Sequence, residues 1–252
     1  MSESEEPRVA VVGDVVHRPA QVWTPTVQAL LRHLSANGLA GAVPEPLGID
    51  GAVETVRLVP GEAGPACWPH QATERGLASA GRLLRVVHDA TRGWRPPPGA
   101  RWSRPPSTDT TGAPFVICHG DPGPWNMTWT GGTATGLFDW DQAYPGPALD
   151  DVAYALEYLA PFRDDAEAVR WHGFEVPPDR RRRIEVFARA YGLDSTAGLV
   201  DAVIRRQAQT VDHVRALADA GVQPQARWVG EGYLDVLADR VAWSRTNREL
   251  ME

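Results

Sequence analysis

Three polar residues follow one another at spacings that could support chemistry on a phosphate. Asp121 comes shortly after the apolar run FVIC, Asn126 stands five positions later, and Asp139 ends a second short apolar segment. One carboxylate can take a hydroxyl proton, while a carboxamide and a second carboxylate can hold magnesium on nucleotide phosphates. Taken singly, Asp121 could be a turn residue and Asn126 a helix cap. Their joint arrangement is what indicates phosphoryl transfer.

A strand and a hairpin must bring these groups together. The run at 115–118 has the character of a buried strand that ends close to the first aspartate. A glycine pair at 131–132 predicts a turn that folds the following strand back beside 127–129. This hairpin would place Asn126 and Asp139 at the same end, within reach of one cation.

The first sixty residues have the pattern of a small sheet with one helix. Two short strands are expected within 8–18 and two more within 43–60, each pair around a glycine turn. Between them, an N-cap threonine followed by proline predicts a helix over 24–37.

Beyond residue 60 the chain is expected to be mostly helical, apart from the strand and the hairpin. Apolar residues recur at helical spacing in five further segments. These segments are 72–92, 150–159, 179–191, 198–220 and 231–243.

Composition limits the possible classes of function. The formal net charge of -7 argues against a nucleic-acid partner and is compatible with a cationic small substrate. No apolar run is long enough to cross a membrane. The acidic start MSESEEPR is unlike a signal peptide, so a cytoplasmic location is expected. Cys67 and Cys118 lack the spacing of metal ligands.

Four segments occur in the order and spacing of one known family. They are His119–Asp121 with Asn126, Phe138–Asp141, Pro147 and Asp151–Ala153. Together they resemble the aminoglycoside phosphotransferase and choline-kinase-like family, and the Asp-to-Asn spacing is that of kinase catalytic loops. Segments 82–90 and 180–194 resemble its helices more loosely. The resemblance implies an α+β, two-lobed protein-kinase-like fold with a small β-rich N-lobe and a mostly helical C-lobe.

Carried over residue by residue, the resemblance assigns five roles. Asp121 would be the catalytic base, and Asn126 and Asp139 would bind Mg²⁺. His119 would brace the catalytic loop without touching substrate. Asp151 would cap a helix or hold that loop by hydrogen bonds, which is a structural role.

The acceptor is expected to lie against the C-lobe near Asp141, Glu157 and the acidic pair at 164–165. Such acids would suit a cationic aminoglycoside, although acidic helix ends are also commonly just solvated. Asp141 could instead assist the metal or face solvent. One or two of the tryptophans near the motif could line the acceptor pocket.

The sequence departs from the family on the nucleotide side. It contains no lysine, and Arg18 stands about where the family's phosphate-binding lysine would lie. Arg18 is either a guanidinium clamp on phosphate oxygens or a solvated strand end. No glutamate stands on the following helix to pair with it. In the expected hinge, 58–61, Leu58 and Val59 would contact the nucleotide, and Pro60 lacks a backbone N–H.

The expected division is an N-lobe over 1–57, the hinge over 58–61 and a C-lobe over 62–252. The leading function is Mg²⁺-dependent transfer of the γ-phosphoryl group of ATP or GTP to a hydroxyl of a small molecule, with an aminoglycoside-like antibiotic among the candidates. The alternative is a catalytically impaired kinase-fold binding or immunity protein. The missing lysine and glycine-rich loop favour that alternative, and the intact aspartate–asparagine–aspartate set disfavours it. The acceptor, the choice of ATP or GTP and the oligomeric state stay open.

Overall fold

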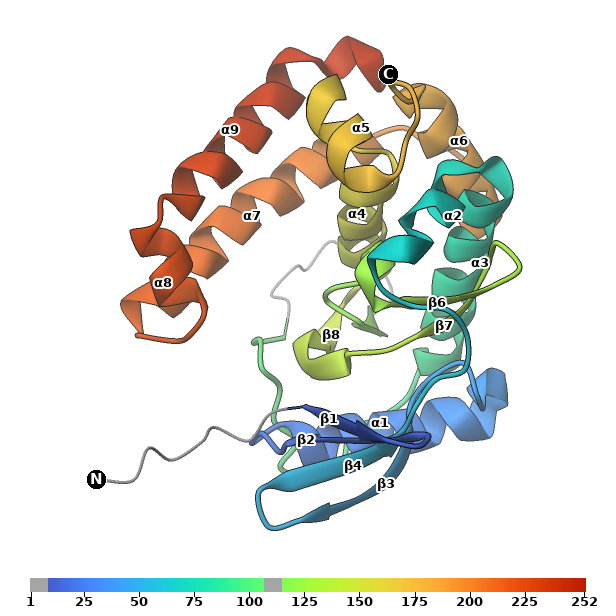
Figure 1. Cartoon of the computed structure of the whole chain (residues 1–252), viewed down its shortest axis with the longest axis vertical. Helices are drawn as coiled ribbons and strands as arrows, with labels where there is room; N and C mark the ends of the chain where they lie inside the picture. The colour runs from blue at the N-terminus through green and yellow to red at the C-terminus, as the bar shows by residue number, and fades with distance from the viewer. Residues whose placement is uncertain (1–8, 107–114) are drawn as a thin grey trace.

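The computed structural model describes residues 9–106 and 115–252. Its chain forms a small β-rich part and a mostly helical part, so the predicted fold class is confirmed (Figure 1). Residues 1–8 of the expected N-lobe lie outside the described residues.

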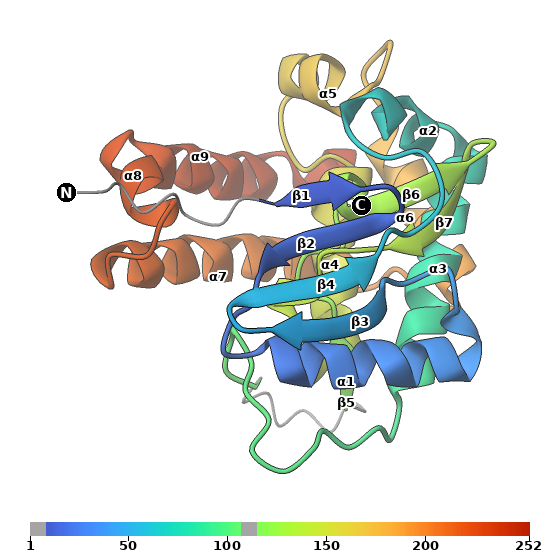
Figure 2. The same ribbon diagram turned by 60° about the horizontal axis from the view of Figure 1, so that its bottom comes forward.

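A four-stranded antiparallel sheet in the order β1-β2-β4-β3 forms the small part (Figure 2). Three of the strands fall within the predicted segments, and β2 extends one residue beyond its segment. The elements are β1 Ala10–Val12, β2 Val15–Pro19, α1 Thr24–Leu34, β3 Glu45–Asp50 and β4 Val53–Arg57. The pairing of β2 with β4 puts Arg18 directly opposite Glu54, so these two side chains extend from the same face of the sheet.

Two short strand pairs carry the predicted motif in the helical part. β5 (Phe115–Cys118) pairs with β8 (Tyr144–Pro147), and β6 (Met127–Thr130) pairs with β7 (Thr133–Leu137) through the predicted glycine turn. The hairpin prediction is therefore confirmed. Trp129 and Glu62 exchange backbone hydrogen bonds of 2.8 Å in both directions, which ties the hairpin to the chain that enters from the sheet.

Most of the predicted helices form within a few residues of their expected limits. The expected helix 72–92 corresponds to α3 and begins slightly later, after Thr73, whose side-chain oxygen caps it by accepting from Gly76 N–H at 3.0 Å. α2, α5, α8 and β8 are elements that the periodicity did not reveal. The helices are α2 Trp68–Ala72, α3 Glu74–Thr91, α4 Ala148–Leu159, α5 Asp165–His172, α6 Arg180–Tyr191, α7 Leu199–Asp219, α8 Gln225–Gly230 and α9 Tyr233–Thr246.

One continuous apolar core runs through both parts of the molecule. It includes Leu31 of α1, Leu84 of α3, Leu137 of β7, Leu156 of α4 and Phe187 of α6, all of them buried. Because α1 contributes to the same core as helices of the larger part, apolar burial holds α1 against the helical part.

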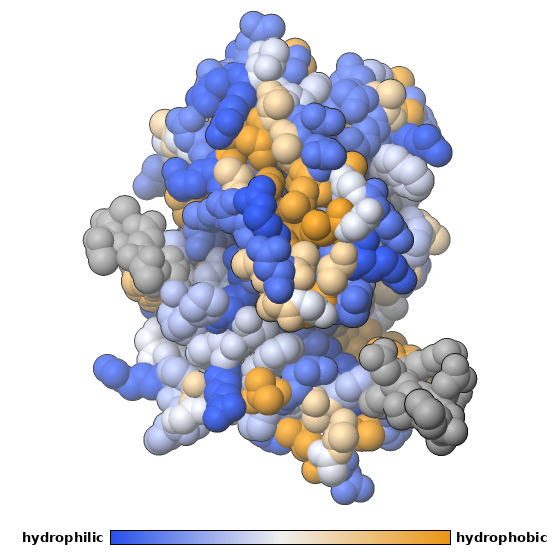
Figure 3. All heavy atoms as spheres, turned by 90° about the vertical axis from the view of Figure 1, so that its left-hand side faces the viewer, coloured by the Kyte–Doolittle hydropathy of each residue, from blue (hydrophilic) through white to orange (hydrophobic). Residues whose placement is uncertain are grey.

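The helices α7 and α9 form an arm whose far ends are joined by α8 (Figure 1). On the face that includes this arm, apolar side chains gather over the helical part (Figure 3). Val222, Trp228 and Val236 are among the exposed apolar residues of the arm. Among the described residues, none of the helices has the length and apolar composition needed to span a bilayer.

Candidate active site

The loop that follows β5 is shaped around a glycine. Gly120 has φ +84, and a side chain there would place its Cβ 2.1 Å from the carbonyl oxygen of Gln142. Only glycine fits both the left-handed backbone and this close approach. The loop therefore turns sharply after His119 and projects Asp121 away from the buried end of the strand.

Asp151 holds this loop from below. Its carboxylate accepts the backbone N–H of His119 at 2.6 Å and that of Gly120 at 2.9 Å. His88 Nε2 donates to it at 3.0 Å, and His88 Nδ1 lies 2.7 Å from the Tyr191 hydroxyl. Burial disfavours the charged form, but the His88 hydrogen bond and nearby charge hold the pKa of Asp151 below its usual range. Asp151 thus holds the loop by hydrogen bonds, which is one of the two roles expected for it.

The Asp121 carboxylate is oriented by donors from its own loop. Trp125 Nε1 lies 3.2 Å from both of its oxygens, and Asn126 Nδ2 lies 2.9 Å from Oδ2. Burial raises the pKa of Asp121, and hydrogen bonds from Tyr154 and Trp125 oppose that rise. A buried carboxylate with a raised pKa is better suited to accept a proton than an exposed aspartate is. Sequence reasoning did not assign Trp125 this contact.

Asn126 and Asp139 lie at one end of the β6–β7 hairpin, as its register requires. Phe138 N–H donates to the Asn126 carbonyl at 2.9 Å, and His119 Nε2 donates to the Phe138 carbonyl at 2.9 Å. Asp139 has φ 62, a left-handed conformation that costs a non-glycine residue about 1–2 kcal/mol. Its side chain is 51% exposed.

These two side chains fit a magnesium ion. The amide nitrogen of Asn126 donates to Asp121, so the amide oxygen is the atom of Asn126 left for a cation. A carboxylate and a carboxamide oxygen are the hard ligands that Mg²⁺ takes from proteins, with water and phosphate completing its shell.

Arg18 reaches from the sheet to the loop after β7. Its guanidinium donates to Glu54 at 2.7 Å, to Asp139 at 3.2 Å and to Asp141 at 3.0 Å. Glu54 is fully buried and also accepts from Gln28 Nε2 at 3.2 Å. Arg18 is therefore not a solvated strand end. Its acidic partner, missed by sequence reasoning, stands on the adjacent strand rather than on the helix. The pairing of β2 with β4 brings the two residues opposite each other.

Two cavities are lined in part by the segments that carry these groups. The sheet-side cavity, of about 480 Å³, lies between the sheet and the segment after β7. Its walls include the three residues predicted to bind nucleotide, apolar side chains, and two of the three carboxylates that contact Arg18. These residues include Val11, Val16, Arg18, Val56, Leu58, Val59, Phe138, Asp139, Trp140 and Asp141.

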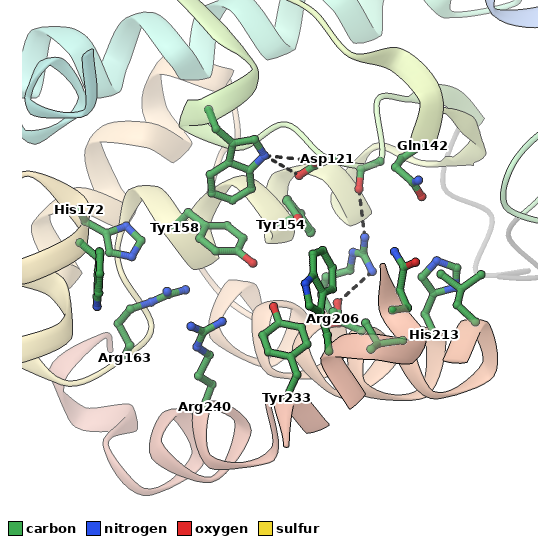
Figure 4. A pocket seen from close by; sticks show the side chains of 18 of the residues that line it. Asp121, Gln142, Tyr154, Tyr158, Arg163, His172, Arg206, His213, Tyr233 and Arg240 are labelled. Atoms are coloured by element: carbon green, nitrogen blue, oxygen red, sulfur yellow. Dashed lines mark hydrogen bonds between the residues drawn. The ribbon is translucent and has the colours of Figure 1, made fainter. Parts of the chain in front are cut away.

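The helix-side cavity, of about 540 Å³, lies within the helical part (Figure 4). Asp121 forms part of its wall, and α4, α5, α7, α8 and α9 supply much of the rest. Trp125 and Trp171 are among the lining residues, so two tryptophans near the motif do face this space.

The acids that were expected around the acceptor lie elsewhere. Asp141 lines the sheet-side cavity, where it pairs with Arg18. Glu157 is buried with its Oε1 3.8 Å from Arg163 and does not line the helix-side cavity. Asp164 caps α5 by accepting from Glu167 N–H, and Asp165 pairs with an arginine of α6. None of these acids therefore lines the helix-side cavity.

Comparison with known proteins places this geometry in a family. The signature of the phosphotransferase enzyme family (APH) matches residues 99–187. The trifolitoxin immunity protein of Rhizobium leguminosarum bv. trifolii is 32% identical over 220 residues, which cover 85% of this chain and 81% of that protein. The chain belongs to the aminoglycoside phosphotransferase and choline-kinase-like family, as its motifs indicated.

Solved structures of low sequence identity share the fold. A choline/ethanolamine kinase family protein from Mesorhizobium loti superimposes with a TM-score of 0.57 at 17% identity, covering 97% of this chain and 91% of that one. An APH(2″) protein in complex with GDP and kanamycin gives a TM-score of 0.58 at 13% identity, covering 96% and 92%. The two-lobed protein-kinase-like fold is thus confirmed.

The Asp151 network makes a prediction about stability. Asp151→Asn should lower the free energy of unfolding by about 3–5 kcal/mol at pH 7, because it breaks a buried charged network from one side. The folded-state pKa of Asp151 is lowered. Its contribution is therefore fully present above the unfolded value of about 3.9 and is lost as pH falls through the folded value. Urea titrations of both proteins at several pH values measure this.

The difference between wild type and variant should be constant near neutrality and shrink below about pH 4. The exposed acid Asp89→Asn on α3 is the matched control and should change little. A wild-type-like midpoint for Asp151→Asn at pH 7 would contradict the assigned role.

Proposed function

We propose that this protein transfers the γ-phosphoryl group of ATP or GTP to a hydroxyl of a small molecule. One observation carries the proposal. The candidate base Asp121 lines one cavity, and the candidate metal ligand Asp139 lines the other. A nucleotide in the sheet-side cavity and an acceptor in the helix-side cavity would then meet at the groups that phosphoryl transfer requires.

The sheet-side cavity suits a nucleotide along its whole length. Apolar side chains of the sheet, with Leu58 and Val59, offer flat contact to a base, and Arg18 stands at the charged end. In the proposed hinge, 58–61, Leu58 N–H already donates to the Asp14 carbonyl at 2.7 Å. Since Pro60 has no N–H, Val59 and Gly61 supply the backbone donors available for the base.

The catalytic step follows from the residues that face the helix-side cavity. The acceptor hydroxyl would approach Asp121, which takes its proton as the oxygen attacks the γ-phosphorus. Trp125 and Asn126 keep that carboxylate in place, so little reorganisation is needed at the moment of reaction. Mg²⁺ held by Asn126 and Asp139 would neutralise the phosphate charge.

Arg18 would replace the family's lysine. Its guanidinium is always charged and can grip two phosphate oxygens. Glu54 and Gln28 fix it from behind through buried hydrogen bonds. The contacts of Arg18 with Asp139 and Asp141 would be exchanged for contacts with phosphate when a nucleotide binds.

A second candidate function is immunity by binding without turnover. The relative that shares 32% of its residues with this chain is called an immunity protein. In addition, Arg18 is hydrogen-bonded to Asp139, the carboxylate that would hold the metal. Calorimetric titration with ATP and GTP, with and without magnesium, separates the two. Binding that requires magnesium supports the kinase, and the lack of any binding would leave the immunity function.

Asp121→Asn should keep magnesium-nucleotide affinity and lose phosphoryl transfer by a factor of about 10²–10⁴, because the amide cannot accept the proton. In the wild type, transfer should fall on the acid side at a pH above the ordinary aspartate pKa of about 3.9, since burial raises the pKa of Asp121. Label transfer from γ-labelled ATP or GTP to hydroxyl compounds measures both effects. Transfer within a few-fold of wild type in the variant would remove Asp121 from the step.

Asp139→Asn should weaken magnesium-dependent nucleotide binding by about tenfold or more, because a metal ligand matters at least as much as its outer partners. Asp141→Asn should have a smaller effect on the magnesium dependence, as the matched neighbour. The apparent magnesium affinity at fixed nucleotide, followed by calorimetry, compares them. A loss confined to Asp141→Asn would mean that the other carboxylate holds the metal.

Arg18→Ala should lower nucleotide affinity by about tenfold or more, because charge-assisted hydrogen bonds to phosphate would be lost. Arg18→Lys should restore part of the loss, since it keeps the charge but not the fork. Arg82→Ala, an exposed arginine of α3, controls for the change in net charge. Unchanged affinity and turnover in Arg18→Ala would exclude a clamp at this position.

A further inference from the structure

The helix-side cavity is lined by arginine rather than by acids. Arg104, Arg163, Arg206 and Arg240 contribute to its walls, against the two carboxylates Asp121 and Glu167. The arginines come from segments far apart in the sequence. Figure 4 shows Arg163 and Arg240 across the cavity from Asp121, with Tyr158 and Tyr233 beside them.

The protein only partly neutralises these guanidinium groups. Glu167 is shared, with its Oε1 3.2 Å from Arg163 and 2.9 Å from Arg240. Glu157, behind the wall, is 3.8 Å from Arg163. Arg206 donates to the Gly120 carbonyl, an uncharged group, at 3.2 Å. Within the described residues, the Nε atoms of Arg163, Arg206 and Arg240 have no hydrogen-bond partner.

Two histidines that line the same cavity have lowered pKa values, in part because of these arginines. Burial, followed by the charges of Arg163 and Arg240, lowers the pKa of His172 to about 3. Burial, followed by Arg104 and Arg206, lowers that of His213 to about 4. Both rings are therefore neutral at pH 7 and add no positive charge of their own.

Aromatic side chains supply flat walls near the candidate base. Trp125 and Tyr158 meet edge to face with 4.5 Å between ring centroids, and Tyr154 lies 5.2 Å from Tyr158. Trp68 packs against Trp125 at 5.9 Å. Such walls fit a planar apolar group, while the arginines beyond them fit an anion.

From this arrangement we infer that the acceptor is an anionic hydroxyl compound that carries a carboxylate and a flat apolar group. The inference rests on the proposed function and narrows its substrate class. The hydroxyl would lie at Asp121, the apolar group against the tryptophan and tyrosine rings, and the carboxylate toward Arg163 and Arg240. A polycation such as an aminoglycoside would meet like charge on this wall, which is destabilising.

In the proposed transfer, one bond to phosphorus forms and one breaks. The acceptor oxygen forms a bond to the γ-phosphorus, and the bond from that phosphorus to the bridging oxygen breaks. The hydroxyl proton passes to Asp121. The products are a phosphate monoester that keeps its carboxylate and a nucleoside diphosphate.

Three matched probes test the charge preference on the wild-type protein without nucleotide. Phenyllactate, its neutral amide phenyllactamide, and the cation phenylalaninol share a phenyl ring and a hydroxyl but differ in charge. Quenching of tryptophan fluorescence and calorimetry at pH 7 give their affinities, with kanamycin as a polycation. The acid should bind about tenfold or more tightly than the amide, and the cations should bind least. Equal affinities, no binding of the acid, or preference for a cation would overturn the inference.

An arginine variant locates the preference in this cavity. Arg240→Gln, at a partly exposed position, should reduce the advantage of the acid over the amide by about tenfold. Arg215→Gln on the outer side of α7 removes the same charge where the side chain is 51% exposed, and should leave that advantage unchanged. An equal effect of both variants, or none from Arg240→Gln, would contradict the assigned wall.

These binding measurements do not depend on turnover, so the two proposals can fail separately. If the acid binds preferentially but no labelled phosphoryl group reaches it or any other hydroxyl compound, the kinase function fails and the charge preference stands. If label reaches kanamycin or phenylalaninol in preference to the acid, the kinase function stands and the substrate class is wrong.

Discussion

The geometry of this site depends on one buried carboxylate. Asp151 accepts two consecutive backbone N–H groups of the catalytic loop, and His88 donates to it from α3. A buried charge is tolerated only when it is paired and hydrogen-bonded. The loop cannot leave its conformation without exposing that charge to an apolar interior. The same carboxylate thus fixes the loop that presents Asp121 and joins α3 to α4 beneath it.

Two cavities of similar size are lined by the residues around this loop and the hairpin that follows it. On one side the sheet and the hinge form apolar walls with a charged end at Arg18. On the other side the helices form aromatic and arginine-rich walls around Asp121. Asn126 serves both sides, because its amide nitrogen orients the base while its amide oxygen is left for a cation. The two cavities therefore offer different surfaces to a ligand.

Arg18 explains why a chain without lysine can still be considered a kinase. Glu54 stands opposite it in the sheet, so the strand pairing itself supplies the acidic partner that the helix lacks. The same guanidinium also holds Asp139 and Asp141. These hydrogen bonds are compatible with two functions. Arg18 could exchange them for phosphate oxygens when a nucleotide binds, or it could keep them in a protein without turnover. A difference in affinity for magnesium-nucleotide decides between them.

The sequence by itself determined the local elements and the order of the motif. The glycine turn and alternating strands predicted the β6–β7 hairpin, and helical periodicity predicted α4, α6, α7 and α9, because each signal is contained within one segment. The family resemblance followed from the same contiguous stretch. Short helices such as α5 and α8 were not predicted, because a segment of so few residues shows little helical periodicity.

Only the tertiary structure decided the character of the two cavities. Glu54 meets Arg18 across 36 positions in the chain. Arg163, Arg206 and Arg240 come together from separate helices and loops. The net charge of the sequence is negative, yet most of the charged residues that line the cavity beside Asp121 are arginines. Net charge sums over the whole surface, whereas the field within a cavity depends on the few side chains that packing directs into it.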